Sequence, residues 1–377
     1  MYELPKCYAT HLSAKQSIYN YVLPKYRLTN GRKPMQRISS IIILIGCILT
    51  LIQAQNWPEF PVLNGPYLGQ VPPGDEPELF APGIVSTGMY TRDIAITPDG
   101  NEIYFCVTLP GFNFATILYS RQENGIWSVP EVVPHMDDPH YFYFEPHISH
   151  DGRKLLFLSN QPDPDAGETT GGDQDIWVME RSGDDWNKPY NLGEPVNSDS
   201  AEYYPSLTRN GTLYFSRQPA GSRNSYIYRS RLINGKYTTP ERLGPEVNSG
   251  QSQYNAFIDP DERFIIVPTV GREDSYGGAD YYISFRTKDD TWSGPVNLGD
   301  KINTPRGQEH SAYVSPDGKY FFFMSVRTPL DDESFSGKTT YALLKSLYMS
   351  PMNGNPGIYW MRAEFIERLH TKSVQTD

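Results

Sequence analysis

The sequence is poor in cysteine, which limits the cross-links and metal sites that the chain can form. It has 3 cysteines, and two of them, Cys7 and Cys47, fall within the first 54 residues. If those residues are removed during export, Cys106 remains alone and no disulfide can form within the chain. Cys106 lies in the apolar run EIYFCV, which predicts a buried thiol that acts as a small hydrophobic side chain.

The short motifs of common catalytic sites are absent as well. The chain has no GxSxG elbow, no HExxH pair, no CxxC pair and no complete phosphate-binding loop of the GxxxxGK[ST] type. These absences disfavour an enzyme and indicate no cofactor. They leave one alternative open, because glycoside or peptide hydrolysis can rely on carboxylates whose separation a sequence does not reveal.

Positive charge is scarce beyond residue 54. Residues 55–377 carry 26 Lys and Arg against 43 Asp and Glu, a formal charge of about −17. Such a surface repels phosphate backbones and anionic headgroups, so the composition argues against nucleic-acid binding and against peripheral membrane binding.

The first 54 residues are predicted to be a targeting segment. Residues 38–52 read ISSIIILIGCILTLI without a charge, which is too short for a membrane span and fits the apolar region of a signal peptide. A start at Met35 would give a signal of ordinary length, with residues 1–34 an over-extended start and cleavage after Ala54. A short membrane anchor and a lipid anchor at Cys47, which ends the lipoprotein-like box LIGC, are the alternatives. We expect a periplasmic or secreted protein without a span in the mature chain.

What the sequence does have is an internal repeat. The turns TPDGNEIYF, SHDGRKLLF, TRNGTLYF, DPDERFIIV and SPDGKYFFF place an Asp or Asn at 99, 151, 210, 261 and 317. Each turn lies between two apolar runs, and an Asp-Gly pair in that setting predicts a hairpin because Gly readily adopts a positive φ. Glu262 replaces Gly in the fourth copy, so we expect that turn to be built differently.

Each copy adds a third segment, such as DIWVMER, and a fourth that begins with an aromatic residue and a proline, such as WNKPYNLGEPVNS. Four short strands every fifty-odd residues predict an all-β fold, a single β-propeller of four-stranded antiparallel blades. The aromatic residues that open the fourth segments are expected to pack between neighbouring sheets rather than to bind a ligand. They are Trp127, Trp186, Tyr237 and Trp292.

The count of segments favours five blades. The fifth copy lacks a fourth segment, and residues 77–87 resemble the missing one, so the N-terminal strand is predicted to complete the last blade and close the ring. A sixth blade hidden in residues 331–357 is the alternative. We assign residues 55–369 to the propeller and residues 370–377 to a disordered tail.

These repeats resemble the WD40-like (PD40) repeats of TolB-type periplasmic propellers. The patterns SPDGKxxxF, GGxDxY and WxxPxNLGxxVNS carry the resemblance over residues 77–366. The resemblance implies a propeller, and it implies little about function, since such propellers serve as scaffolds, binding modules and non-catalytic domains of peptidases.

The segments before the turns are expected to line the central channel. Their polar residues are our candidates for binding a peptide, a glycan or another ligand, and alternation along each strand should leave about half of them facing inward. The candidates are Asp93, Glu145, His147, Glu202, Tyr204, Gln253, Asn255, Glu309 and His310. A metal site is not expected.

Two further groups of polar residues are interpreted as structural. Asp175 and Asp280 follow paired glycines, and the first lies in an acidic loop with Asp163, Asp165, Glu168 and Asp173. That loop lacks the ligand order of a calcium loop, so hydrogen bonds to a neighbouring turn are expected. The arginines that recur after each third segment are assigned to the repeat rather than to a shared pocket. They are Arg121, Arg181, Arg229, Arg231 and Arg286.

The sequence therefore favours an exported propeller that binds or scaffolds an envelope protein, a peptide or a glycan. A hydrolase that uses carboxylates of the channel is the alternative.

Overall fold

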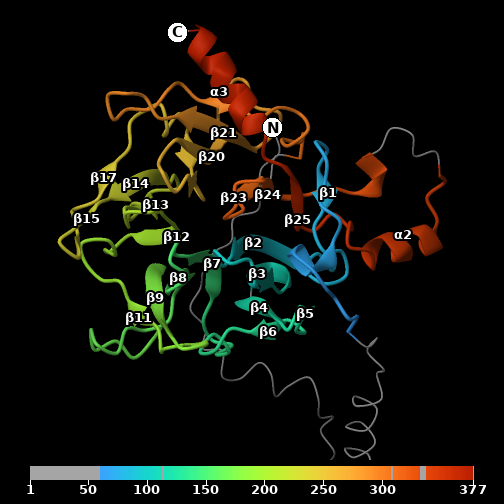
Figure 1. Cartoon of the computed structure of the whole chain (residues 1–377), viewed down its shortest axis with the longest axis horizontal. Coiled ribbons are helices and arrows are strands. Elements are labelled where there is room, and N and C mark those ends of the chain that lie inside the picture. Colours follow the sequence, from blue (N-terminus) through green and yellow to red (C-terminus); the bar gives the residue numbers. More distant parts are fainter. Residues whose placement is uncertain (1–59, 113, 307–308, 332–336, 377) are drawn as a thin grey trace, which may run out of the picture. The chain divides into compact units, whose positions relative to one another are not determined.

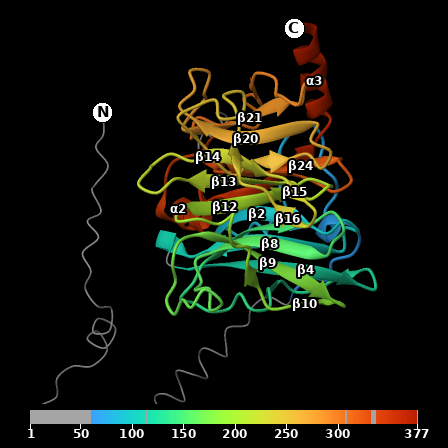
Figure 2. The same ribbon diagram turned by 90° about the vertical axis from the view of Figure 1, so that its left-hand side faces the viewer.

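The computed structural model describes residues 60–112, 114–306, 309–331 and 337–376. The predicted targeting segment and the lipid-anchor candidate Cys47 lie outside these residues. Five antiparallel sheets follow one another around a common centre (Figure 1), and a view turned by 90° shows their strands stacked in layers (Figure 2). The five-bladed propeller predicted from the repeats is confirmed.

Each blade is a meander whose innermost strand precedes the Asp-Gly turn. Blade one contains β2 (Tyr90–Ile96), β3 (Glu102–Thr108), β4 (Ala115–Glu123), β5 (Ile126–Trp127) and β6 (Glu131–Val132). Blade two contains β7 (Tyr143–Ile148), β8 (Lys154–Ser159), β9 (Asp175–Ser182), β10 (Asp185–Trp186) and β11 (Tyr190–Asn191). Blade three contains β12 (Ala201–Leu207), β13 (Leu213–Gln218), β14 (Tyr226–Ser230) and β17 (Glu241–Arg242), with the hairpin β15 (Leu232–Ile233) and β16 (Lys236–Tyr237) beside it.

Blade four contains β18 (Ser252–Gln253), β19 (Phe257–Ile258), β20 (Phe264–Val270), β21 (Ala279–Phe285) and β22 (Val296–Asn297). Blade five contains β23 (His310–Val314), β24 (Tyr320–Ser325), β25 (Gly357–Arg362) and β1 (Glu78–Leu79). Short 3₁₀ turns occur at η1 (Tyr67–Gly69), η2 (Pro110–Phe112) and η3 (Pro329–Asp331).

Two residues of each repeat shape the hairpin turn: a residue with positive φ, and the Asp or Asn before it, whose side chain accepts hydrogen bonds. In blade one the Gly100 N–H donates to the Thr97 carbonyl at 2.8 Å, and Gly100 has a φ of +73°. The Asp99 carboxylate accepts hydrogen bonds from the Thr97 hydroxyl and the Asn101 N–H, which stiffens the turn. Glu262 takes the glycine position in blade four with a φ of +55°, so the expectation of a differently built turn was wrong.

The N-terminal strand closes the ring as predicted. Within β1 and β25, Glu78 pairs with Trp360 and Leu79 with Tyr359. Phe80 follows directly and packs edge-on against Phe322 and Trp360, with both ring centroids at 5.1 Å. This contact belongs to a hydrophobic cluster that also includes residues of blades one and four.

Three of the recurring aromatic residues lie between sheets, as expected, whereas the buried Trp127 donates its indole N–H to the Gly65 carbonyl, in the segment ahead of β1, at 2.7 Å. Trp186 of blade two packs against Tyr104 of blade one and donates its indole N–H to the Tyr104 hydroxyl at 3.0 Å. Trp292 of blade four meets Tyr214 of blade three in the same edge-on arrangement. Tyr237 is half-buried against the cluster that joins blades two and three.

The region between β24 and β25 contains helix α2 (Tyr341–Tyr348) and, among its described residues, no strand, so it holds no sixth blade. Helix α3 (Phe365–Thr376) follows β25 and projects from the propeller in both views (Figures 1 and 2). Residues 370–376, for which we expected a disordered tail, are helical.

Replacing Phe80 by Ala should lower the free energy of unfolding by about 3–5 kcal/mol, because Phe80 is fully buried in the closing contact. Phe112→Ala is the control, since Phe112 is 48% exposed and its truncation should change stability little. Urea unfolding followed by near-UV circular dichroism measures both. Equal effects of the two substitutions would contradict the role of Phe80 in ring closure.

Candidate ligand-binding site at the propeller axis

A break in the innermost strand of each blade turns one polar side chain toward the axis. The strand pairing shifts between Arg92 and Ile94 in blade one and at the equivalent place in blades two, three and five, and in blade four the strand is divided into β18 and β19. The residue at each break has a positive φ of 52–63°. These five axial residues are Asp93, Glu145, Tyr204, Asn255 and Ser311.

The axial residues bind one another across the centre of the propeller. Glu145 accepts hydrogen bonds from the Tyr204 N–H at 2.7 Å and from the Asn255 side-chain amide at 3.3 Å. The Asn255 amide also reaches the Ser311 hydroxyl at 3.4 Å, and that hydroxyl donates to Asp93. All five axial residues are buried, so a polar ring fills the axis where the sequence predicted a central channel.

Arg92 completes the ring electrostatically. Its guanidinium lies 2.9 Å from an Asp93 oxygen and 2.8 Å from a Glu145 oxygen. Burial alone would lower the pKa of Arg92, but the two carboxylates raise it above its usual range. Burial raises the pKa of Glu145 to about 7, and Arg92 opposes that shift. Removing Arg92 would therefore leave two buried carboxyl groups without their cation.

The remaining candidates lie away from this ring. Glu202 accepts from the Ser198 N–H and hydroxyl and lies 2.6 Å from the Arg217 guanidinium. Glu309 accepts from the Thr304 N–H and hydroxyl. Both carboxyl groups are fully buried, and burial raises the pKa of each to about 7.

The other three candidates divide between the two ends of the axis. Gln253 is fully buried in β18, and His310 packs against Tyr254 with ring centroids 5.2 Å apart. His147 lies beyond the break in β7 and lines a pocket of about 670 Å³ at the end of the axis where the Asp-Gly turns lie. We call this pocket the axial funnel. Of the candidates, only His147 lines it.

The axial funnel has an apolar wall and a charged rim. Its wall includes one aliphatic residue from each innermost strand, at the same position three residues after the axial residue: Ile96, Ile148, Leu207, Ile258 and Val314. At the rim Arg209 pairs with Asp261 at 2.9 Å, Arg263 with Asp259 at 2.8 Å, and Lys319 with Asp317 at 3.0 Å. Sequence reasoning missed these residues, although their constant distance from the turns could have located them.

His147 supplies a neutral donor in this wall. Its Nε2 atom accepts a hydrogen bond from the Leu207 N–H at 3.0 Å, so the ring proton lies on Nδ1. Burial, together with His150, lowers the pKa of His147 to about 3, and the ring stays neutral at physiological pH. A ligand in the funnel would meet aliphatic side chains and an uncharged imidazole.

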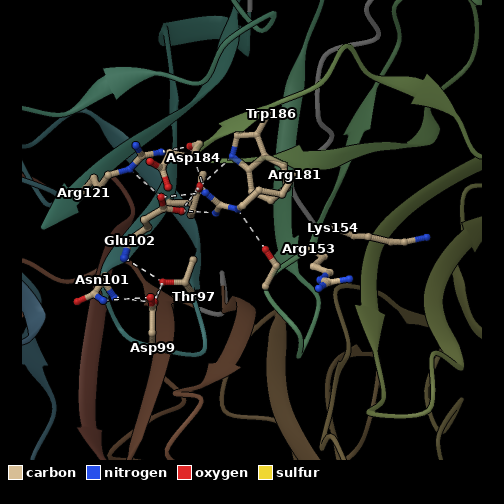
Figure 3. A network of polar contacts seen from close by, with 12 residues as sticks. Thr97, Asp99, Asn101, Glu102, Arg121, Arg153, Lys154, Arg181, Asp184 and Trp186 are labelled. Carbon is tan, nitrogen blue, oxygen red and sulfur yellow. Dashed lines mark hydrogen bonds and ion pairs between the residues drawn. The ribbon is translucent and has the colours of Figure 1, made fainter. Parts of the chain in front are cut away.

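The recurring arginines form ion pairs, several of them between neighbouring blades, and Arg121 and Arg181 line a common pocket of about 650 Å³ in which both pair with Glu102. Figure 3 shows Glu102 of blade one between Arg121, at 2.8 Å, and Arg181 of blade two, at 2.5 Å. Arg181 also stacks on Trp186 at 4.1 Å from the ring centroid. Arg229 and Arg231 both contact Glu241 and Asp290, and Arg286 pairs with Asp290.

The two aspartates that follow paired glycines have structural partners. Asp280 accepts from the Tyr276 N–H of the neighbouring turn at 2.6 Å, and Asp175 accepts from the Asn191 amide at 2.7 Å. In the described residues no group of three or more His, Cys, Asp and Glu is arranged to hold a metal ion.

Comparison with known proteins finds distant structural similarity to several solved structures. No protein-family model and no curated protein matches the sequence. TolB from Acinetobacter baumannii is similar over 73% of this chain at 14% identity, with a TM-score of 0.39, and this chain spans 57% of it. A puromycin-hydrolyzing peptidase from Mycobacterium tuberculosis is similar over 72% of this chain and 42% of its own length, at 12% identity and a TM-score of 0.38.

A third similar structure is the β-propeller domain of the trilobed protease from Pyrococcus furiosus. The similarity covers 62% of this chain and 64% of that domain, at 13% identity and a TM-score of 0.32. At these values the comparisons assign neither a ligand nor a reaction to this chain.

Replacing Arg92 by Met should lower the free energy of unfolding by about 3–5 kcal/mol, because Asp93 and Glu145 lose their buried counter-ion. Adding Glu145→Gln to Arg92→Met should restore part of the loss. Chemical denaturation of the two variants measures the coupling. If the double variant is no more stable than Arg92→Met, the ion pair does not hold the axis.

The buried carboxyl of Glu309 should make stability depend on pH. Its pKa is raised from 4.5 to about 7 in the folded protein, so the folded state holds this proton more tightly than the unfolded chain does. The free energy of unfolding should therefore fall as the pH rises from about 4.5 to about 7. Glu309→Gln should reduce that fall, whereas Glu131→Gln, at an exposed position, should leave it unchanged. An unaltered profile for Glu309→Gln would contradict the shift.

Proposed function

We propose that this protein is an exported binding module that holds a peptide segment of another envelope protein in the axial funnel. The observation that carries the proposal is the funnel itself, a pocket of about 670 Å³ with an aliphatic wall. The polar ring closes the axis, so a ligand would enter from the turn end and stop against the wall. Apolar side chains of a peptide fit such a wall better than the polar faces of a glycan do.

The charged rim suits an extended peptide with polar groups on either side of an apolar residue. Arg209, Arg263 and Lys319 alternate with the acidic groups that they pair with, so the rim has both signs of charge. Arg209 and Arg263 are more than half exposed and are free to exchange a rim partner for a peptide group at modest cost.

The proposed location of the protein in the envelope is inferred from the apolar residues 38–52 of the sequence, which lie outside the described part of the chain. No helix within the described ranges has the length and apolar character that crossing a bilayer requires.

A hydrolase remains the second candidate. The carboxyl groups of Glu202 and Glu309 have pKa values of about 7, which suits general acid catalysis. Both are fully buried, and neither lines the axial funnel. Glu145 is held by Arg92, Tyr204 and Asn255. The contacts therefore favour a binding module over an enzyme.

Filling the funnel should abolish peptide binding. Val314 ends β23 and lines the funnel, so Val314→Trp should block the wall. Val132→Trp is the matched control, because Val132 ends β6 at an exposed position outside the funnel. Selection of a phage-displayed library of random ten-residue peptides on the wild-type protein, followed by titration of the enriched peptide, measures the effect.

We expect the enriched peptide to bind the wild type and the Val132→Trp variant and to lose at least about tenfold in affinity for Val314→Trp. Thermal unfolding of the variants would show whether the fold is kept. Equal binding by both tryptophan variants, or no enrichment of any peptide, would overturn the proposed function.

A further inference from the structure

Helix α2 carries an outward apolar face that the described residues leave uncovered. Tyr341, Leu344 and Tyr348 lie at helical spacing on one side and are 82%, 51% and 76% exposed, and Met349 next to them is 73% exposed. Figure 1 shows α2 outside the sheets, beyond β1 and β25. Large side chains with this exposure are unusual for a surface that faces only water.

The exposure belongs to an ordered helix and not to a frayed one. The Thr340 hydroxyl caps α2 by accepting from the Leu343 N–H at 3.1 Å, and Leu343 and Leu347 are half-buried on the other side. The side-chain amides of Asn353 and Asn355 both donate to the Gly88 carbonyl at 2.8 Å, which holds the following loop against the chain ahead of β2. The outward face is thus presented in a fixed position.

The segment that contains α2 is locally basic, in contrast to the chain beyond residue 54 as a whole, although Asp331, Asp332 and Glu333 precede it. Residues 337–356 contain Lys338 and Lys345 and no Asp or Glu, although the chain beyond residue 54 has many more acids than bases. Exposed Tyr, Leu and Met with flanking lysines are typical of helices that lie at a membrane interface. The helix has eight residues, about 12 Å, so it can lie on a bilayer but not cross it.

We propose that α2 is a contact site for a phospholipid bilayer containing anionic lipids, with Tyr341, Leu344 and Tyr348 entering the headgroup region. Residues 38–52 of the sequence form a second apolar segment, predicted to bring the chain to a membrane during export. If residues 38–52 are retained as the short membrane anchor or the lipid anchor considered above, α2 supplies the second contact that stable attachment requires; if they are cleaved after Ala54, α2 acts alone. The proposal is independent of the axial funnel, which opens at the turn end of the axis.

Hydroxyl-radical footprinting of the full-length protein tests this proposal. Oxidation of Tyr341, Tyr348 and Met349 is measured by mass spectrometry with and without vesicles of phosphatidylethanolamine and phosphatidylglycerol. We expect the vesicles to slow oxidation at these three residues by about threefold or more, because the side chains leave water. Tyr190 and Tyr276, which are exposed elsewhere, should be oxidised at an unchanged rate and serve as internal references.

Two substitutions of matched exposure separate this contact from attachment by other parts of the chain. Leu344→Glu should abolish the shielding of Tyr341 and Tyr348, whereas Ile233→Glu in β15, where the side chain is 53% exposed, should leave it intact. Unchanged oxidation of wild-type α2 in the presence of vesicles would overturn the proposal. So would shielding that survives Leu344→Glu, or shielding that appears only when envelope proteins are added in place of lipid.

Discussion

The pairing of β1 with β25 is the interaction on which the rest of the molecule depends. Each sheet of a propeller packs against its two neighbours, and in this chain β1 supplies the strand that completes the last blade. Two residues of β1 make the strand pairing, and Phe80 behind them enters the largest hydrophobic cluster. Closure thus links a segment near residue 80 to strands more than 240 residues later, and the facing sides of the first and last blades are buried in one hydrophobic cluster.

The polar ring at the axis is the second constraint, and it depends on closure. Five positive-φ residues, one from each blade, satisfy one another only when all five blades are in place. Each such residue costs of order 1–3 kcal/mol in backbone strain, which the surrounding hydrogen bonds and the Arg92 ion pairs must offset. The polar ring in turn closes one end of the axial funnel. The depth of the proposed binding site is therefore set by the side chains that fill the centre of the propeller.

Much of the fold could be predicted from the sequence because each copy of the repeat contains the residues that form its hairpin turn. Asp-Gly turns, the aromatic residue that opens each fourth segment and the residues before the first blade sufficed to predict five blades and their closure. The sequence could not show α2, since the insertion breaks the repeat and the packing of the chain around it decides its form. The turn at Glu262 was also predicted wrongly. The surrounding hairpin holds Glu262 at a positive φ that Gly would adopt more readily, so the turn keeps the shape of the other copies.

The positions of the axial residues could be predicted in part, whereas of the predicted candidates only His147 lines the axial funnel. Asp93, Glu145, Tyr204 and Asn255 each stand six residues before the turn residue of their copy, as does Ser311, and this constant offset is why they meet. Glu202, Glu309 and Gln253 fall two residues earlier, where a regular alternation would place them on the same side as the axial residues, and the break in each innermost strand separates the two sets. Arg92 was missed because the break in the strand gives two successive residues access to the axis, which a regular alternation does not allow.

The short closing strand has a mechanical consequence. The chain ahead of β1 contacts blade one through Leu63 and Gly65 and blade five through Tyr67, so a pull on that end acts first on these contacts and next on the two-residue pairing with β25. A load applied there would peel the strand away and open the propeller between its first and last blades, whereas a load at residue 362 or beyond would act on the six-residue pairing of β24 with β25. The molecule should therefore yield to tension from its N-terminal side at a lower force than from its C-terminal side.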